Sequence, residues 1–170
     1  EEMKQMTTES RITVTSFEQN FSEFASSSQS ALESLTYAQD LSFASLVKVD
    51  HIIYKQNAYR CLEVDKDARE VQAVMVDHHT CRMGKWYDSG NGAKSFGDMP
   101  SYRTLEPPHQ AVHENIHEVL NYIYLDWSMK PELQELITNC FMKAEQGSEE
   151  IVKIIDKLVI ERRNLYIDQA

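Results

Sequence analysis

The stretch that decides the fold class covers residues 107–120 and reads Pro-Pro-His-Gln-Ala-Val-His-Glu-Asn-Ile-His-Glu-Val-Leu. A proline pair is a helix-start signal, because the first turn of a helix does not need the N–H groups that proline lacks. The residues that follow repeat at intervals of three and four, which is the spacing of one helix face. That face carries His109, Val112, His113, Ile116 and Leu120. The pattern predicts an amphipathic helix that starts at the proline pair.

The flanking segments also show helical patterns. Toward the C-terminus, Pro131 predicts the start of another helix, and Gln146-Gly147-Ser148-Glu149 predicts its end and the cap of a last helix. Toward the N-terminus, a helix is expected from about Arg69 to Tyr87, followed by a long loop from Asp88 to Pro108. No stretch alternates convincingly like a strand. The sequence therefore predicts an all-α fold, a helical bundle.

The N-terminal third shows heptad-like spacing. Steps of four and three connect Phe17, Phe21, Phe24, Ser28, Ala31, Leu35, Ala38, Ser42, Ser45, Val49 and Ile52. This spacing is typical of a coiled coil or long helical hairpin, although a helix packed on the body of the domain fits it equally well. Serines interrupt this seam, so we expect weak packing and a break near residues 26–30. The predicted domains are a coiled-coil-like stalk at 1–45 and a helical bundle at 46–170.

Composition excludes several classes of protein. The chain has 170 residues, 42% of them hydrophobic and 26% charged, which is ordinary for a globular protein. Its formal net charge of −10 argues against nucleic acid or an anionic membrane surface as a partner. No apolar run approaches the roughly 20 residues that span a bilayer. The sequence starts with Glu-Glu-Met and is expected to be a fragment of a longer chain.

The three cysteines, Cys61, Cys81 and Cys140, are widely spaced and odd in number. A disulfide-stapled secreted domain would have an even and denser set. We therefore expect reduced thiols in a cytoplasmic protein, one of which is available as a metal ligand.

Histidine spacing points to a metal site. His109, His113 and His117 lie on one face of the predicted helix, and residues four apart on a helix lie one turn above another. Two imidazoles at that spacing reach a single metal ion, but such pairs also occur by chance. Cys81, in Cys-Arg-Met-Gly-Lys-Trp, and His51, in a largely apolar helical stretch, each fit a buried structural role when taken alone.

Taken together in this order, these elements resemble the chemoreceptor zinc-binding (CZB) domain of bacterial chemoreceptors and of some diguanylate cyclases. That family has a histidine on the first helix, a Cys-x-aliphatic-Gly-x-aromatic element and a His-x-x-x-His pair on a later helix. Here they are His51, Cys81–Trp86 and His109–His113, with Leu105–Pro108 as a similar lead-in. The resemblance covers about residues 50–120.

The resemblance implies a zinc site with four ligands, His51, Cys81, His109 and His113, inside the bundle. A register shifted by one turn, with His113 and His117 as the pair, stays open. His78, His79, Asp50 and Asp88 are candidates for side chains that orient a ligand through a hydrogen bond. Cys61 and Cys140 are expected to be structural thiols, and Trp86 and Tyr87 to pack the bundle.

The function implied is regulation by zinc, without enzymatic activity. In such a module the Zn²⁺-bound thiolate of Cys81 would sense oxidants such as hypochlorous acid, zinc level, or both, and relay a conformational change to a signalling region. The expected context is the C-terminal part of a cytoplasmic homodimeric chemoreceptor that acts on chemotaxis signalling proteins, with no direct membrane contact by this segment. The alternatives are a purely structural zinc module and the regulatory domain of a diguanylate cyclase.

Overall fold

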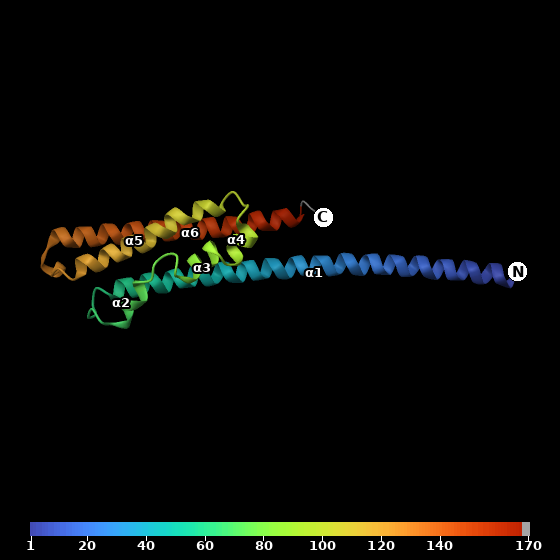
Figure 1. Cartoon of the computed structure of the whole chain (residues 1–170), viewed down its shortest axis with the longest axis horizontal. Helices are drawn as coiled ribbons and strands as arrows, with labels where there is room; N and C mark the ends of the chain where they lie inside the picture. The colour runs from blue at the N-terminus through green and yellow to red at the C-terminus, as the bar shows by residue number, and fades with distance from the viewer. Residues whose placement is uncertain (168–170) are drawn as a thin grey trace. The chain divides into compact units, whose positions relative to one another are not determined.

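The computed structural model describes residues 1–167, and the side chains of residues 1–165 (Figure 1). The described residues form helices joined by turns, with no strand among them, so the all-α prediction is confirmed. The chain divides into two compact units, Glu1–Asp40 and the part that begins at Leu41. Within residues 1–167, no helix combines the length and apolarity that crossing a bilayer requires.

The first unit consists of one helical segment, the N-terminal part of α1 (Glu2–Arg60). The expected break near the serines is wrong, because α1 runs through them without interruption. Its hydroxyl side chains bond to carbonyls one turn back, as Ser34 Oγ does to Ser30 O at 2.9 Å, which a helix tolerates. Phe17, Phe21 and Phe24 are each more than 60% exposed. The apolar face that they form on this segment is therefore open to solvent.

The second unit contains the last turns of α1 and the remaining helices, which are α2 (Arg69–Val74), α3 (Arg82–Asp88), α4 (Asn91–Phe96), the 3₁₀ helix η1 (Tyr102–Leu105), α5 (Glu106–Ile123), the 3₁₀ helix η2 (Trp127–Met129) and α6 (Pro131–Ile167). Helices α5 and α6 lie side by side as an antiparallel pair (Figure 1). Their starts agree with the predictions, since Pro107 and Pro108 occupy the first turn of α5 and Pro131 opens α6.

The core of this unit lies between α5, α6 and the last turns of α1. Its fully buried side chains are mainly aliphatic: Val47, Val74, Leu105, Val112, Ile116, Val119, Ile151, Ile155 and Leu158. Helix α1 is held to α6 by an ion pair between Lys48 and Asp156 (2.6 Å) and by stacking of Tyr59 on Phe141 (4.2 Å between centroids).

The face of α1 that packs into the core is not the predicted seam. Between residues 41 and 60 the buried positions are Ala44, Val47, His51, Tyr54 and Ala58, whereas the seam residues Val49 and Ile52 are about half exposed, at 49% and 52%. Residues spaced three and four apart therefore line two different faces of α1. Within residues 41–60 one face packs into the core of the second unit, to which this part of α1 belongs, and the predicted seam stays exposed.

The predicted helix from Arg69 to Tyr87 is wrong, because the structure has two short helices, α2 and α3, with a turn between them. Asp77 causes the interruption. Its carboxylate accepts the backbone N–H of His79 (2.8 Å), and its carbonyl accepts the N–H groups of Thr80 (3.0 Å) and Cys81 (3.1 Å). An aspartate that bonds to the backbone two residues on competes with helical bonding and produces a turn.

The predicted loop from Asp88 to Pro108 is also wrong in part, because α4 and η1 lie within it. Aromatic packing orders this segment. The ring of Trp86 lies 5.4 Å from that of Phe96 and 6.0 Å from that of Tyr102, and Tyr87 stacks on Tyr102 at 4.6 Å. These contacts join residues on different elements, so local turn chemistry does not reveal them.

The predicted helix end at residues 146–149 is wrong, since α6 continues through them to Ile167. Gly147 has a packing role. A Cβ atom there would lie 2.9 Å from the carbonyl oxygen of Pro108 and 3.0 Å from Val112 Cγ2. The glycine therefore allows the start of α5 to approach α6 closely, and this is the part of α5 that carries His109 and His113.

Candidate metal centre

Cys81 occupies the N-cap position of α3. Its sulfur accepts the backbone N–H of Gly84 at 3.3 Å, lies 3.3 Å from the carbonyl oxygen of His78 and lies 3.3 Å from Nε2 of His109. The turn that Asp77 creates therefore ends at Cys81 and directs its sulfur toward α5.

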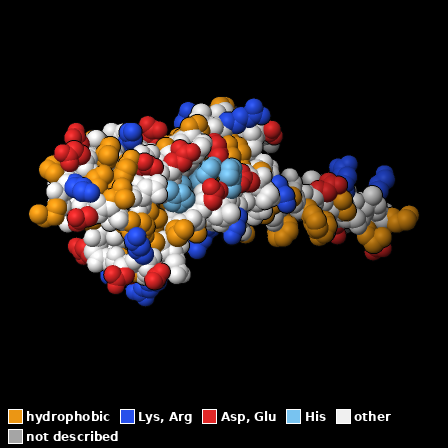
Figure 2. All heavy atoms as spheres, turned by 60° about the vertical axis from the view of Figure 1, so that its left-hand side comes forward, with side chains coloured by type: hydrophobic (Ala, Val, Ile, Leu, Met, Phe, Trp, Pro, Cys, Tyr) orange, Lys and Arg blue, Asp and Glu red, His pale blue; other side chains and the backbone are white. Residues whose placement is uncertain are grey.

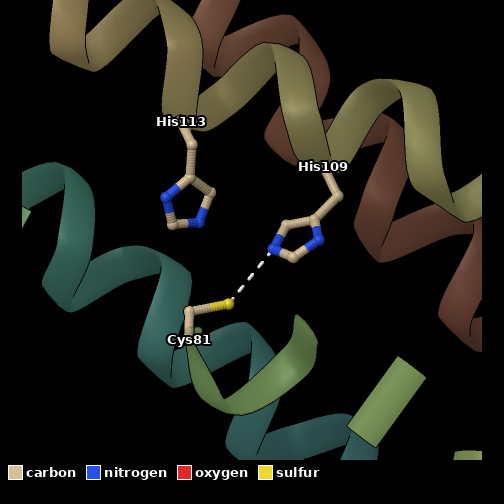
Figure 3. A group of neighbouring side chains, drawn as sticks. All are labelled: Cys81, His109 and His113. Carbon is tan, nitrogen blue, oxygen red and sulfur yellow. Dashed lines mark hydrogen bonds between the residues drawn. The ribbon is translucent and has the colours of Figure 1, made fainter. Parts of the chain in front are cut away.

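His109 and His113 project from successive turns of α5 toward this sulfur (Figure 3). Both are nearly inaccessible to solvent, at 1% and 3% exposure, and their rings lie 5.1 Å apart. One ligand atom from each of Cys81, His109 and His113 lies within 4.8 Å of the others. The structure thus brings three of the four predicted ligands together, from two separate elements.

His51, the fourth predicted ligand, enters the same space from α1. It is buried, and its ring lies 5.7 Å from that of His109. Its Nδ1–H donates to the carbonyl of Val47 at 2.9 Å. Nε2 therefore carries a lone pair, and this buried atom has no hydrogen-bond partner among the described residues. A buried polar atom without a partner is costly, and binding a metal ion removes that cost.

His113 is oriented in the same way as His51. Its Nδ1–H donates to the carbonyl of Val76 at 2.8 Å, which leaves Nε2 with a lone pair, and its ring packs on Tyr54 at 4.5 Å. His117 faces a different group, because its Nε2 lies 3.0 Å from the carbonyl of Val74. The His109–His113 pair meets Cys81, whereas His117 bonds to the end of α2.

Burial keeps the imidazoles of this site neutral. It lowers the pKa of His51 and, together with the neighbouring histidines, lowers the pKa of His109 to about 2 and that of His113 to about 4. Burial also raises the pKa of the Cys81 thiol, against the smaller opposite effect of the N–H groups of Gly84 and Met83. Without a cation the site therefore holds neutral donors, and a bound divalent ion reverses the effect on the thiol.

This donor set fits zinc. Three imidazole nitrogens and one sulfur, all from protein side chains, are the ligand types of closed tetrahedral zinc sites. Oxygen-preferring ions such as Mg²⁺ and Ca²⁺ do not favour such ligands. Nε2 of His51 and Nε2 of His113 carry the lone pairs that such an ion needs, and that of His51 has no hydrogen-bond partner among the described residues.

The four polar residues expected to orient a ligand contact one another or neighbouring residues, and Asp50 Oδ2 is buried without a hydrogen-bond partner among the described residues. Asp50 lies 3.3 Å from Nη1 of Arg82, His79 bonds to Asp88 at 2.9 Å, and His78 lies 3.2 Å from Glu106. The hydrogen bond with Asp88 raises the pKa of His79. The groups that hold His51 and His113 are backbone carbonyls, those of Val47 and Val76.

These two carbonyls were missed by reasoning from sequence. The carbonyl of Val47 lies one helical turn before His51, so helix periodicity alone was enough to find it. That of Val76 lies in the turn after α2, and no sequence signal connects it with His113. Of the remaining residues singled out, Cys61 and Cys140 are buried free thiols, and Trp86 stacks on Phe43 at 4.4 Å.

Gly84 holds the Cys81 turn in place. A Cβ atom at this position would lie 1.9 Å from the carbonyl oxygen of His78 and 2.7 Å from the backbone of His79. Because backbone atoms cannot move aside as a flexible side chain can, the turn tolerates only glycine here.

We expect Gly84→Ala to lower the free energy of unfolding by at least the roughly 1–3 kcal/mol typical of overpacking, and to weaken zinc binding by displacing Cys81. Urea unfolding and zinc competition assays measure the two effects. The control is Lys85→Ala, at an exposed position of the same helix, which should change neither quantity. An equal free energy of unfolding and equal zinc affinity in the two variants would contradict the assigned role of Gly84.

Residues 51–120 match the family model of the chemoreceptor zinc-binding domain. The match begins at His51 and includes Cys81, His109 and His113, so it supports a CZB domain in this segment and confirms that resemblance. No curated protein and no solved structure matches the chain.

Proposed function

We propose that this chain is a zinc-binding sensory domain of a bacterial chemoreceptor. In this proposal, zinc is held by His51, Cys81, His109 and His113, and the thiolate of Cys81 senses oxidant, zinc level, or both. The observation that carries it is the convergence of the Cys81 thiol with the imidazoles of His109 and His113, beside the buried His51, whose Nε2 has no hydrogen-bond partner among the described residues. A regulatory role without enzymatic activity follows, because four protein ligands leave no open coordination position for a substrate.

Access to Cys81 supports a role in oxidant sensing. A cavity of about 280 Å³ is lined by Cys81, His51 and His113 together with Asp50 and Arg82. Bound zinc would keep the sulfur as the reactive thiolate at neutral pH. The sulfur of such a thiolate would attack the oxygen of hypochlorous acid, forming an S–O bond as the O–Cl bond breaks, which would give a sulfenic acid and a chloride ion. The oxidised sulfur is a poorer metal ligand than the thiolate.

The position of Cys81 at the start of α3 offers a route for the signal. A change at the sulfur alters the cap of α3, the short helix that also carries Trp86. The indole of Trp86 stacks on Phe43 of α1. In this proposal the change therefore reaches α1, the helix expected to connect to the signalling region.

The expected context follows from the same features. The exposed apolar seam of α1 supports a parallel homodimer, and chemotaxis signalling proteins in the cytoplasm are the proposed output partners. Two alternatives use the same site. In one, zinc serves only to stabilise the bundle, and in the other the domain regulates a diguanylate cyclase.

The test is the zinc content of the purified chain, as isolated and as the Cys81→Ala variant, before and after a small excess of hypochlorous acid. We expect one tightly bound zinc ion per chain, released by the oxidant, and a large loss of zinc in Cys81→Ala even without oxidant. Cys140→Ala is the matched control, since it removes another buried thiol and should behave as the unmodified chain does. Tightly bound zinc that hypochlorous acid does not release would favour the structural alternative, and a chain that binds no zinc tightly would refute the proposal.

A further inference from the structure

A second group of metal-binding side chains lies on the turn between α2 and α3. One ligand atom from each of Asp77, His78 and His79 lies within 4.8 Å of the others. Two carboxylates adjoin them, with Asp88 2.9 Å from His79 Nδ1 and Glu106 3.2 Å from His78 Nε2. These five side chains, which we call the turn cluster, include none of the four predicted zinc ligands.

The turn cluster is accessible to solvent, whereas the three histidines among the four predicted ligands are buried. The side chains of Asp77 and His79 are 56% and 54% exposed, and that of His78 is 12% exposed. Histidine side chains reach the surface beside acidic ones in Figure 2. An ion held here exchanges with solvent more readily than one enclosed by α1, α3 and α5.

The backbone of this turn is shaped independently of any ion. The carboxylate of Asp77 accepts the N–H of His79, and the fit of Gly84 against the His78 carbonyl fixes the peptide between the two histidines. The imidazoles of His78 and His79, which contact Glu106 and Asp88, lie side by side with 4.0 Å between their ring centroids. A preformed pair of imidazoles beside carboxylates is a site that loses little entropy when an ion binds.

His78 also borders the buried site. Its ring lies 5.8 Å from that of His109 and 6.3 Å from that of His113. The carbonyl of the same residue lies 3.3 Å from Cys81 Sγ. His78 is therefore the side chain between the solvent-exposed members of the turn cluster and the buried ligands.

We propose that the turn cluster binds a second divalent transition-metal ion, more weakly than the buried site does, and that metal enters and leaves the buried site through it. Two imidazoles with carboxylate oxygens suit Zn²⁺ and similar ions rather than Mg²⁺ or Ca²⁺. Exposure and the smaller number of nitrogen and sulfur donors account for the weaker binding. The transfer role rests on the proposed function of the buried site, whereas the binding of a second ion does not.

The first test is zinc titration of the metal-free chain against competing chelators of graded strength. We expect one tight and one weaker zinc ion per chain. The double variant Asp77→Asn/His79→Gln should lose only the weaker ion, because the amide oxygen introduced in place of the carboxylate can still accept the backbone N–H of residue 79 and keep the turn. His117→Gln is the matched control and should keep both ions, because His117 bonds to Val74 and belongs to neither site.

Each result of this titration decides one of the two proposals. Cys81→Ala should lose only the tight ion. A single zinc ion per chain that the double variant retains would overturn the second site, and so would loss of the tight ion from the double variant. The unmodified chain could instead bind a weak ion but no tight one, with the weak ion lost in the double variant. That result would uphold the second site and refute the proposed function.

The second test is the rate at which an excess of strong chelator withdraws the tight zinc ion. We expect slower withdrawal from Asp77→Asn/His79→Gln than from the unmodified chain or His117→Gln, at unchanged affinity of the buried site. Equal rates in all three proteins would overturn the transfer role.

Discussion

Replacing His113 with glutamine will lower the zinc affinity of the chain by more than roughly 100-fold. Removing a residue that only orients a ligand through a hydrogen bond typically costs about 10- to 100-fold in metal affinity, and the loss of a ligand itself should exceed this range. Glutamine has a similar volume and keeps a donor for the Val76 carbonyl, so the protein fold should survive. Competition with a chromophoric zinc chelator measures the change.

The matched control for this prediction is His117→Gln, one helical turn further along α5. Because His117 bonds to the carbonyl of Val74 and lies outside the group formed by Cys81, His109 and His113, we expect its zinc affinity to stay close to that of the unmodified chain. A loss in His117→Gln as large as that in His113→Gln would show that the register is shifted by one turn, because His113 is a ligand in both registers and His117 only in the shifted one. In that case His109 would not be a ligand.

The second large effect is a loss of stability on acidification of the metal-free chain. In the folded state the pKa of His109 is about 2 and that of His113 about 4, against an ordinary value of 6.5 for both. The unfolded chain therefore binds more protons below pH 6.5, and stability that is fully present above this value is lost as pH falls toward the folded pKa values. Burial lowers the pKa of His51 as well, which acts in the same direction.

Each of these histidines should lower the free energy of unfolding by about 1.4 kcal/mol per pH unit within this window. Urea unfolding in the presence of a chelator, at a series of pH values below 6.5, measures the slope. The His113→Gln variant should show a shallower slope, because one of the titrating groups is gone. Metal-free stability that stays constant between pH 6.5 and about 4 would contradict burial of neutral imidazoles in this site.

Helix starts and the candidate ligands could be named from sequence because their signals are local or ordered along the chain. Pro107, Pro108 and Pro131 act within a single turn, so the beginnings of α5 and α6 were predicted. The order of His51, Cys81, His109 and His113 indicated the CZB resemblance, which the family match over residues 51–120 supports. Their role as zinc ligands stays a prediction for the affinity measurements.

The errors have a common physical cause, which is that a residue was interpreted without its neighbours in space. Gly147 has the appearance of a helix end, but its missing side chain makes room for α5. The segment after Asp88 has the composition of a loop, but the packing of Trp86, Phe96 and Tyr102 orders it into short helices. The seam ending at Ile52 has the spacing of a packed face, but the core uses another face of α1.

The sequence by itself determined the all-α class, the starts of the two long helices of the second unit and the residues to examine for metal binding. These depend on periodicity, on proline geometry and on the order of a motif. Only the tertiary structure decided that the carbonyl of Val76 orients the imidazole of His113, and that His78 lies between an exposed cluster and a buried one. Such arrangements depend on contacts between segments far apart in the chain, and helix packing sets these contacts.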